Sequence, residues 1–177
     1  MPSDGPTAPV GREEPPQRNG WKLYAWREFS RAFADLVSEV ERLERENPLE
    51  FRAHPSTKRL AAIYRLITVT IPSNPNAPEF RQGNTLGSAN RHWFSAGFYE
   101  RYRLFFRFRS DARAIVYAWV NDEETLRARG ARNDAYAVFE RMLKAGAPPG
   151  DWDRLLRESE SLQLPGGARP DGGQKVG

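Results

Sequence analysis

Arginines alternate with aromatic and aliphatic side chains along the segment YRLFFRFRSDARAIVYAWVND, residues 102–122. Successive side chains of a strand point to opposite faces, so this spacing predicts a basic face opposite an apolar one. From residue 91 to residue 113 only two side chains are acidic, whereas arginine occupies positions 91, 101, 103, 107, 109 and 113. Like charges on one sheet face repel each other unless an anion lies across them. Arginines interleaved with rings are typical of surfaces that bind single-stranded RNA.

The composition is that of a basic, cysteine-free chain of one domain's length. It has 177 residues, a formal net charge of +4 and a sequence pI near 9.6, which favours an acidic partner such as nucleic acid. A genome rich in arginine codons would give the same excess. The absence of cysteine excludes a disulfide framework, a zinc knuckle and a thiol nucleophile, and indicates a cytoplasmic setting. No segment has the length of a membrane span, the apolar core of a secretory signal or the pattern of a lipid-binding helix, so we expect no membrane partner.

Common catalytic motifs are absent. The sequence contains no P-loop, no dinucleotide-binding glycine fingerprint, no HExxH and no GxSxG. Its two histidines, His54 and His92, are not at the spacing of metal ligands. We therefore expect neither a metal nor a cofactor.

Hydrophobic periodicity predicts the elements that must position the arginines. Proline, glycine and charge dominate residues 1–18 and 163–177, which are predicted to be disordered tails around one domain at 19–162. The predicted class is α+β, with a helical pair on one face of a mainly antiparallel sheet and C-terminal helices. The expected order begins with a strand at 21–25, a helix from Phe29 to about Asn47, a helix from its cap Ser56 to Pro72, and a long loop to residue 90. Strands follow at 91–100, 102–109 and 114–120, and the last of these is expected in the middle of the sheet. Helices at about 134–146 and from Asp151 complete the domain.

Several of these segments, in this order, resemble the YhaV family of bacterial toxins, distant relatives of RelE. The segments are NGWKLYA, YRLFFRF and AWVNDEETLRARGARNDAYAVFERMLKAGAPPGDW. The resemblance covers residues 19 to about 160 and leaves out both predicted tails. It implies a RelE-like fold and a metal-independent endoribonuclease that cuts mRNA on or near the ribosome to arrest translation. It also implies an antitoxin of the PrlF type as partner, with contact to operator DNA only through that antitoxin.

The resemblance also implies roles for individual residues. In metal-free cleavage the 2′-hydroxyl of RNA attacks the adjacent phosphate, so the enzyme must stabilise phosphate charge and move two protons. Arg103 is expected to face the active surface, with Arg101 and Arg91 as further catalytic candidates. The candidates for proton transfer are His92, Tyr136 and Asp122, although a lone histidine beside a tryptophan, or a tyrosine on an apolar helix stripe, is more often a packing residue. The arginines expected to bind RNA are Arg107, Arg109, Arg127, Arg129 and Arg132.

Two positions depart from the family pattern. Ser95 and Gly97 stand where an arginine and a lysine are expected. Losing two cations would weaken RNA affinity and transition-state stabilisation. An alternative hypothesis is therefore a catalytically weakened RelE-like module that binds RNA or the antitoxin without cutting.

Overall fold

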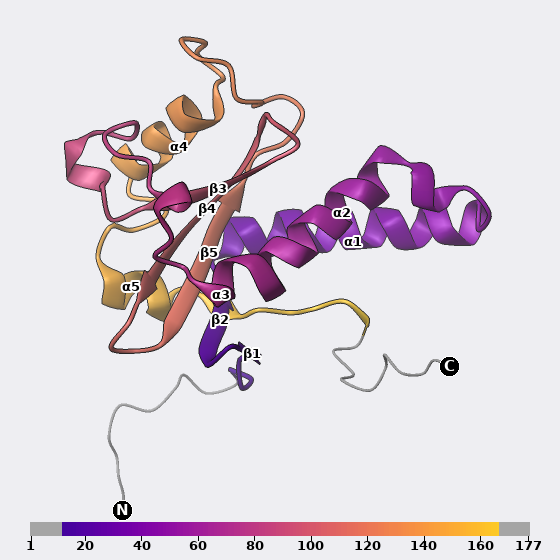
Figure 1. The fold of residues 1–177 in the computed structure, drawn as a ribbon, viewed down its shortest axis with the longest axis horizontal. Coiled ribbons are helices and arrows are strands. Elements are labelled where there is room, and N and C mark those ends of the chain that lie inside the picture. Colours follow the sequence, from indigo (N-terminus) through magenta and orange to yellow (C-terminus); the bar gives the residue numbers. More distant parts are fainter. Residues whose placement is uncertain (1–11, 167–177) are drawn as a thin grey trace, which may run out of the picture.

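A twisted sheet separates two groups of helices in the computed structural model, which describes residues 12–166 (Figure 1). The strands and α-helices are β1 (Gln17–Arg18), β2 (Trp21–Ala25), α1 (Arg27–Glu46), α2 (Pro55–Arg65), α3 (Ile71–Ser73), β3 (Phe94–Phe98), β4 (Tyr102–Arg109), β5 (Ala114–Val120), α4 (Ala135–Lys144), α5 (Trp152–Arg157) and β6 (Glu160–Ser161). Short helical turns are η1 (Phe51–Ala53), η2 (Leu66–Thr70), η3 (Pro78–Phe80) and η4 (Ser88–Asn90).

The strands are ordered β1-β2-β5-β4-β3, and β6 pairs with β2. Only the β2–β5 pair is parallel among the described strands; the others are antiparallel. The predicted α+β class and the central position of β5 are confirmed. Nearly every residue of β5 is buried, because helices cover the sheet on both faces.

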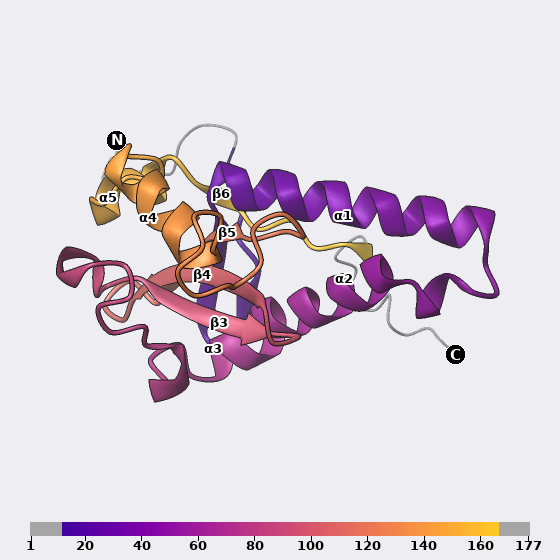
Figure 2. The ribbon, with the colours of Figure 1, turned by 90° about the horizontal axis from the view of Figure 1, so that it is seen from above.

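The helical pair α1 and α2 lies side by side on one face of the sheet and extends beyond it, while α4 and α5 lie on the other face (Figures 1 and 2). Helix α1 buries Phe29, Phe33, Leu36 and Val40, which recur every three or four residues. Helix α2 begins at Pro55, and its cap is the His54 imidazole, which accepts a hydrogen bond from the Ser56 N–H at 3.0 Å. The predicted cap at Ser56 is wrong, since its hydroxyl donates to Glu39 instead.

The β4 side chains alternate between the two faces of the sheet, as the sequence pattern predicted, but the face predicted to be basic also packs against a core. Leu104 and Phe106 pack under α1 and α2, whereas Phe105 packs against Phe139 of α4 with ring centroids 4.3 Å apart. The face that carries the arginines is therefore partly covered by the C-terminal helices. Arginines on this face remain accessible only where α4 and α5 leave the sheet bare.

The domain boundaries differ from the predicted ones where the structure describes them. Residues 12–18 belong to the fold, because β1 pairs with β2 and the Arg12 guanidinium donates to the Leu156 carbonyl at 2.8 Å. Leu164, beyond the predicted boundary at 162, packs against the core of α1 and α2. The rest of the predicted tails, 1–11 and 167–177, lies outside the described residues.

Candidate active site

Arg103 and Tyr136 line one open pocket of 520 Å³ beside the β3–β4 turn. The two residues lie 33 positions apart in the sequence, on β4 and α4. Besides them, the pocket is lined by Glu79, Arg81, Ser95, Gly97, Phe98, Tyr99 and Glu100. This pocket combines guanidinium groups, carboxylates and a phenol, which can stabilise phosphate charge and transfer protons in metal-free RNA cleavage.

The Arg103 side chain is held close to the sheet. In the antiparallel β3–β4 pair Arg103 stands opposite Gly97. Its Nη1 donates to the Glu100 carbonyl at 2.8 Å and to the Tyr102 carbonyl at 2.9 Å. The guanidinium keeps further donors for a phosphate, since Arg103 is only half-buried.

Asn121 fixes the backbone of Arg103. This buried side chain accepts a hydrogen bond from the Arg103 N–H at 2.7 Å and donates to the carbonyls of Arg101 and Thr125, at 3.1 and 2.8 Å. The beginning of β4 is thereby tied to the loop that leads to Arg127. Asp122 belongs to the same loop and accepts hydrogen bonds from Glu124 and Thr125, outside the pocket.

Tyr136 is fixed at both ends. Its hydroxyl and the Ser95 hydroxyl are hydrogen-bonded at 2.8 Å. The Arg127 guanidinium stacks 4.4 Å from the centre of its ring and forms an ion pair with the buried carboxylate of Asp134. Asp134 also caps α4 by accepting from the Tyr136 and Ala137 N–H groups. Burial raises the pKa of Asp134, but the hydrogen bonds from Ala128 and Arg127 outweigh it, so that the pKa is lowered.

The long loop before β3 brings Glu79 and Arg81 to the pocket, which sequence reasoning did not identify. Gln82 organises this loop: its amide donates to the carbonyls of Asn90 and Trp93 and accepts from the Leu86 N–H. A bridge between Arg81 and Phe94 aligns the loop with the edge of β3. In the sequence, the unusual length of this loop was the only feature that indicated a functional role for it.

Arg107 is a correction to the predicted RNA-facing set. It is only 9% exposed, with its guanidinium 5.5 Å from the ring centres of both Trp93 and Trp152 and its Nη1 donating to the Gly150 carbonyl. Burial, together with the positive charge of Arg109, lowers the pKa of Arg107 to about 10. Arg107 therefore packs between the sheet and α5 and does not face solvent.

His92 and Arg91 lie outside the pocket, on the exposed segment before β3. Partial desolvation of the imidazole and the positive charge of Arg107 lower the pKa of His92. The predicted strand at 91–100 begins only at Phe94, so alternation did not apply to these two residues.

The remaining arginines divide by accessibility. Arg101, Arg129 and Arg132 are exposed, and Arg101 donates to the Arg127 carbonyl. Arg109 is exposed but forms a bidentate pair with Asp111. The Arg127 guanidinium is paired with Asp134 and stacked on the Tyr136 ring. The cations that line the pocket are therefore Arg81 and Arg103. Arg101 is exposed just before β4, and Arg129 and Arg132 are exposed on the loop that follows Asn121.

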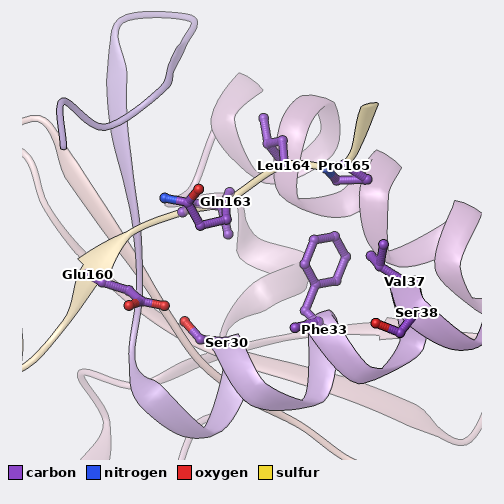
Figure 3. A pocket seen from close by; sticks show the side chains of 10 residues that line it. Ser30, Phe33, Val37, Ser38, Glu160, Gln163, Leu164 and Pro165 are labelled. Atoms are coloured by element: carbon purple, nitrogen blue, oxygen red, sulfur yellow. The ribbon is translucent and has the colours of Figure 1, made fainter. Parts of the chain in front are cut away.

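A second pocket, of 270 Å³, lies between α1 and the C-terminal segment (Figure 3). Phe33, Val37 and Leu164 give it an apolar lining, and Glu160 is its charged residue. A pocket with a carboxylate and no cation does not suit RNA. Within the described residues no three His, Asp or Glu side chains gather as metal ligands would, and no helix is long and apolar enough to cross a membrane.

Comparison with known proteins decides the family. A family model described as a toxin with endonuclease activity, of a toxin-antitoxin system, matches residues 23–160. The chain belongs to the YhaV toxin family. It is 46% identical over 151 residues to the "Ribonuclease toxin YhaV" of Escherichia coli strain K12, covering 82% of this chain and 96% of that protein. The same identity and coverage relate it to "Toxin YhaV" of Escherichia coli O157:H7. No solved structure matches the chain significantly.

Membership of the YhaV family makes the chain a toxin with endonuclease activity, and a toxin of such a system has an antitoxin as its partner. Ser95 and Gly97, the two positions where basic residues were expected, both line the pocket that contains Arg103. Ser95 is bound to the Tyr136 hydroxyl, and Gly97 leaves room for the Arg103 guanidinium. Each thus has a definite place in this site.

Proposed function

We propose that this YhaV toxin is a metal-independent endoribonuclease with a RelE-like fold. Its substrate is mRNA in the cytoplasm, which it cuts at the ribosome so that translation stops. A PrlF-type antitoxin neutralises the toxin. Any contact of the toxin with operator DNA is made through that antitoxin. The single observation that carries the proposal is that Arg103 and the Tyr136 hydroxyl line the same pocket. The name of the K12 relative, a ribonuclease toxin, supports RNA as the substrate.

In this mechanism the scissile phosphate binds at the free donors of Arg103. The guanidinium stabilises the extra negative charge that develops when the 2′-hydroxyl attacks the phosphorus. The carboxylates of Glu79 and Glu100, at the rim of the same pocket, are the groups available to accept the proton of that hydroxyl.

Tyr136 supplies the second proton transfer. Its hydroxyl, oriented by Ser95, donates a proton to the departing 5′-oxygen as the P–O bond breaks. The products are a 2′,3′-cyclic phosphate and a fragment with a 5′-hydroxyl. Arg101, Arg129 and Arg132 bind the flanking phosphates.

The test is expression of the toxin without antitoxin, followed by mapping of 5′-hydroxyl ends in cellular mRNA. Purified protein is then assayed on free RNA in the presence of EDTA, and on ribosome-bound mRNA without EDTA, because ribosomes need Mg²⁺ to stay assembled. Arg103→Ala should reduce cleavage by about a hundredfold, the effect of losing one transition-state donor. Arg45→Ala, at the exposed end of α1, is the matched control and should cut normally. RNA binding without cutting by the wild-type protein would overturn the proposal and favour a non-catalytic module.

A further inference from the structure

Tyr99 is a large aromatic side chain left in solvent at the rim of the active pocket. It is 56% exposed, although most aromatic rings of the described chain pack in the two cores. Its ring lines the same pocket as Arg103 and Tyr136. An exposed ring beside a guanidinium is the arrangement that binds a nucleobase next to its phosphate.

The backbone holds Tyr99 in an unfavourable conformation. Tyr99 and Glu100 have φ angles of 47° and 64°, in the left-handed region that glycine or asparagine adopts more readily. Neither position carries such a residue. Strain of this kind is retained where the surrounding structure enforces it, and it gathers at functional sites.

Two contacts fix the direction of the ring. The Tyr99 hydroxyl donates to the Lys58 carbonyl of α2 at 3.2 Å, and the ring meets the edge of Phe98 with centroids 5.9 Å apart. The next carbonyl in the turn, that of Glu100, accepts from the Arg103 guanidinium. The turn therefore sets the position of the ring and of the phosphate-binding group together.

We infer that Tyr99 is a stacking platform for a base of single-stranded RNA next to the scissile phosphate. The inference rests on the proposed function, since it takes Arg103 as the phosphate-binding group. The ring stacks on the face of a base and makes no hydrogen bond to its edge. Stacking therefore fixes the register of the RNA strand in the pocket without selecting one base.

The test uses a short RNA in which every 2′-hydroxyl is methylated, so that it cannot be cut, with 2-aminopurine at successive positions. Wild-type protein should quench the fluorescence strongly at one position. Tyr99→Asn, which tolerates the left-handed backbone, should abolish that quenching and weaken binding about tenfold. Tyr99→Phe, which keeps the ring, should retain both within about threefold.

Arg103→Ala separates this inference from the proposed function. If Arg103→Ala abolishes cleavage of normal RNA while Tyr99→Asn binds and quenches like the wild type, Tyr99 is not a platform and the nuclease assignment stands. If the wild type never cuts but Tyr99→Asn still loses quenching, the platform stands and the nuclease assignment fails. Should Tyr99→Asn unfold, as judged by its melting temperature, Tyr99→Gly replaces it. Lost antitoxin binding with unchanged RNA affinity would overturn the inference in favour of a protein-docking role.

Discussion

The Arg103 guanidinium lies against the bare backbone of Gly97, its partner across the β3–β4 pair. A Cβ placed on Gly97 would be 3.2 Å from Nη1 and 3.3 Å from Cζ of Arg103, tighter than ordinary van der Waals contact. Gly97 therefore leaves the space that the Arg103 guanidinium occupies, and this holds the charge of Arg103 in a defined place.

Gly97→Val should displace the Arg103 side chain and lower the cleavage rate about tenfold, because a small misplacement of a catalytic group is costly. The fold should survive, since the guanidinium is the flexible end of a long side chain. Melting temperature and single-turnover cleavage are the two measurements. Gly150→Ala, where an added Cβ meets nothing within 4 Å, is the control. An unchanged rate in Gly97→Val would show that the position of Arg103 is unimportant.

Tyr136→Phe should reduce cleavage about a hundredfold, because it removes the proton donor to the leaving oxygen. Ser95→Ala should reduce it only about fivefold, by the value of one orienting hydrogen bond. In the Tyr136→Phe background Ser95→Ala should have no further effect, since both changes break the same hydrogen bond. Fully additive losses in this double-mutant cycle would contradict the proposed pairing.

Local sequence patterns were sufficient for strands β2, β4 and β5 and for the two faces of β4, but not for the start of β3 or for the short strands β1 and β6. Alternation placed Arg103 and Arg107 on one face and Leu104 on the other, because side-chain direction in a strand depends only on the backbone repeat. The same alternation carries no information on what covers a face. Helix α5 arrives more than forty residues later and brings Trp152 over Arg107, so one arginine became buried and the other did not.

The composition of the pocket depends on contacts between distant segments, which a single sequence does not reveal. Arg81 reaches the pocket through a loop without regular periodicity, and Tyr136 through the capping of α4 by Asp134. Tyr99 was assigned to a strand face, whereas it lies in the turn with a positive φ. Of the predicted catalytic candidates, Arg103 and Tyr136 line the pocket, and the strand pattern together with the family resemblance indicated the face only for Arg103.

Arg107→Met should leave RNA affinity unchanged and maintain or raise stability. A methionine has a similar length and packs between Trp93 and Trp152 without the cost of a buried charge, the cost that lowers the pKa of Arg107 to about 10. Urea denaturation and RNA binding at several salt concentrations measure the two effects. Arg129→Ala is the comparison, with weaker binding and a smaller salt dependence expected. A loss of RNA affinity in Arg107→Met would return Arg107 to the RNA-binding surface.

His92 should influence stability rather than cleavage. Its pKa is lowered in the folded state, by desolvation and by Arg107, so the unfolded chain binds a proton more readily. Stability should therefore be highest near neutral pH and should fall as the pH drops through 6.5, the ordinary pKa of histidine. In His92→Gln this dependence should flatten between about pH 7.5 and 5.5, above the range where carboxylates titrate. Melting temperatures across that interval measure it. The cleavage rate of His92→Gln at pH 7.5 should equal that of the wild type, whereas a large loss would identify His92 as the proton-transfer group despite its place outside the pocket.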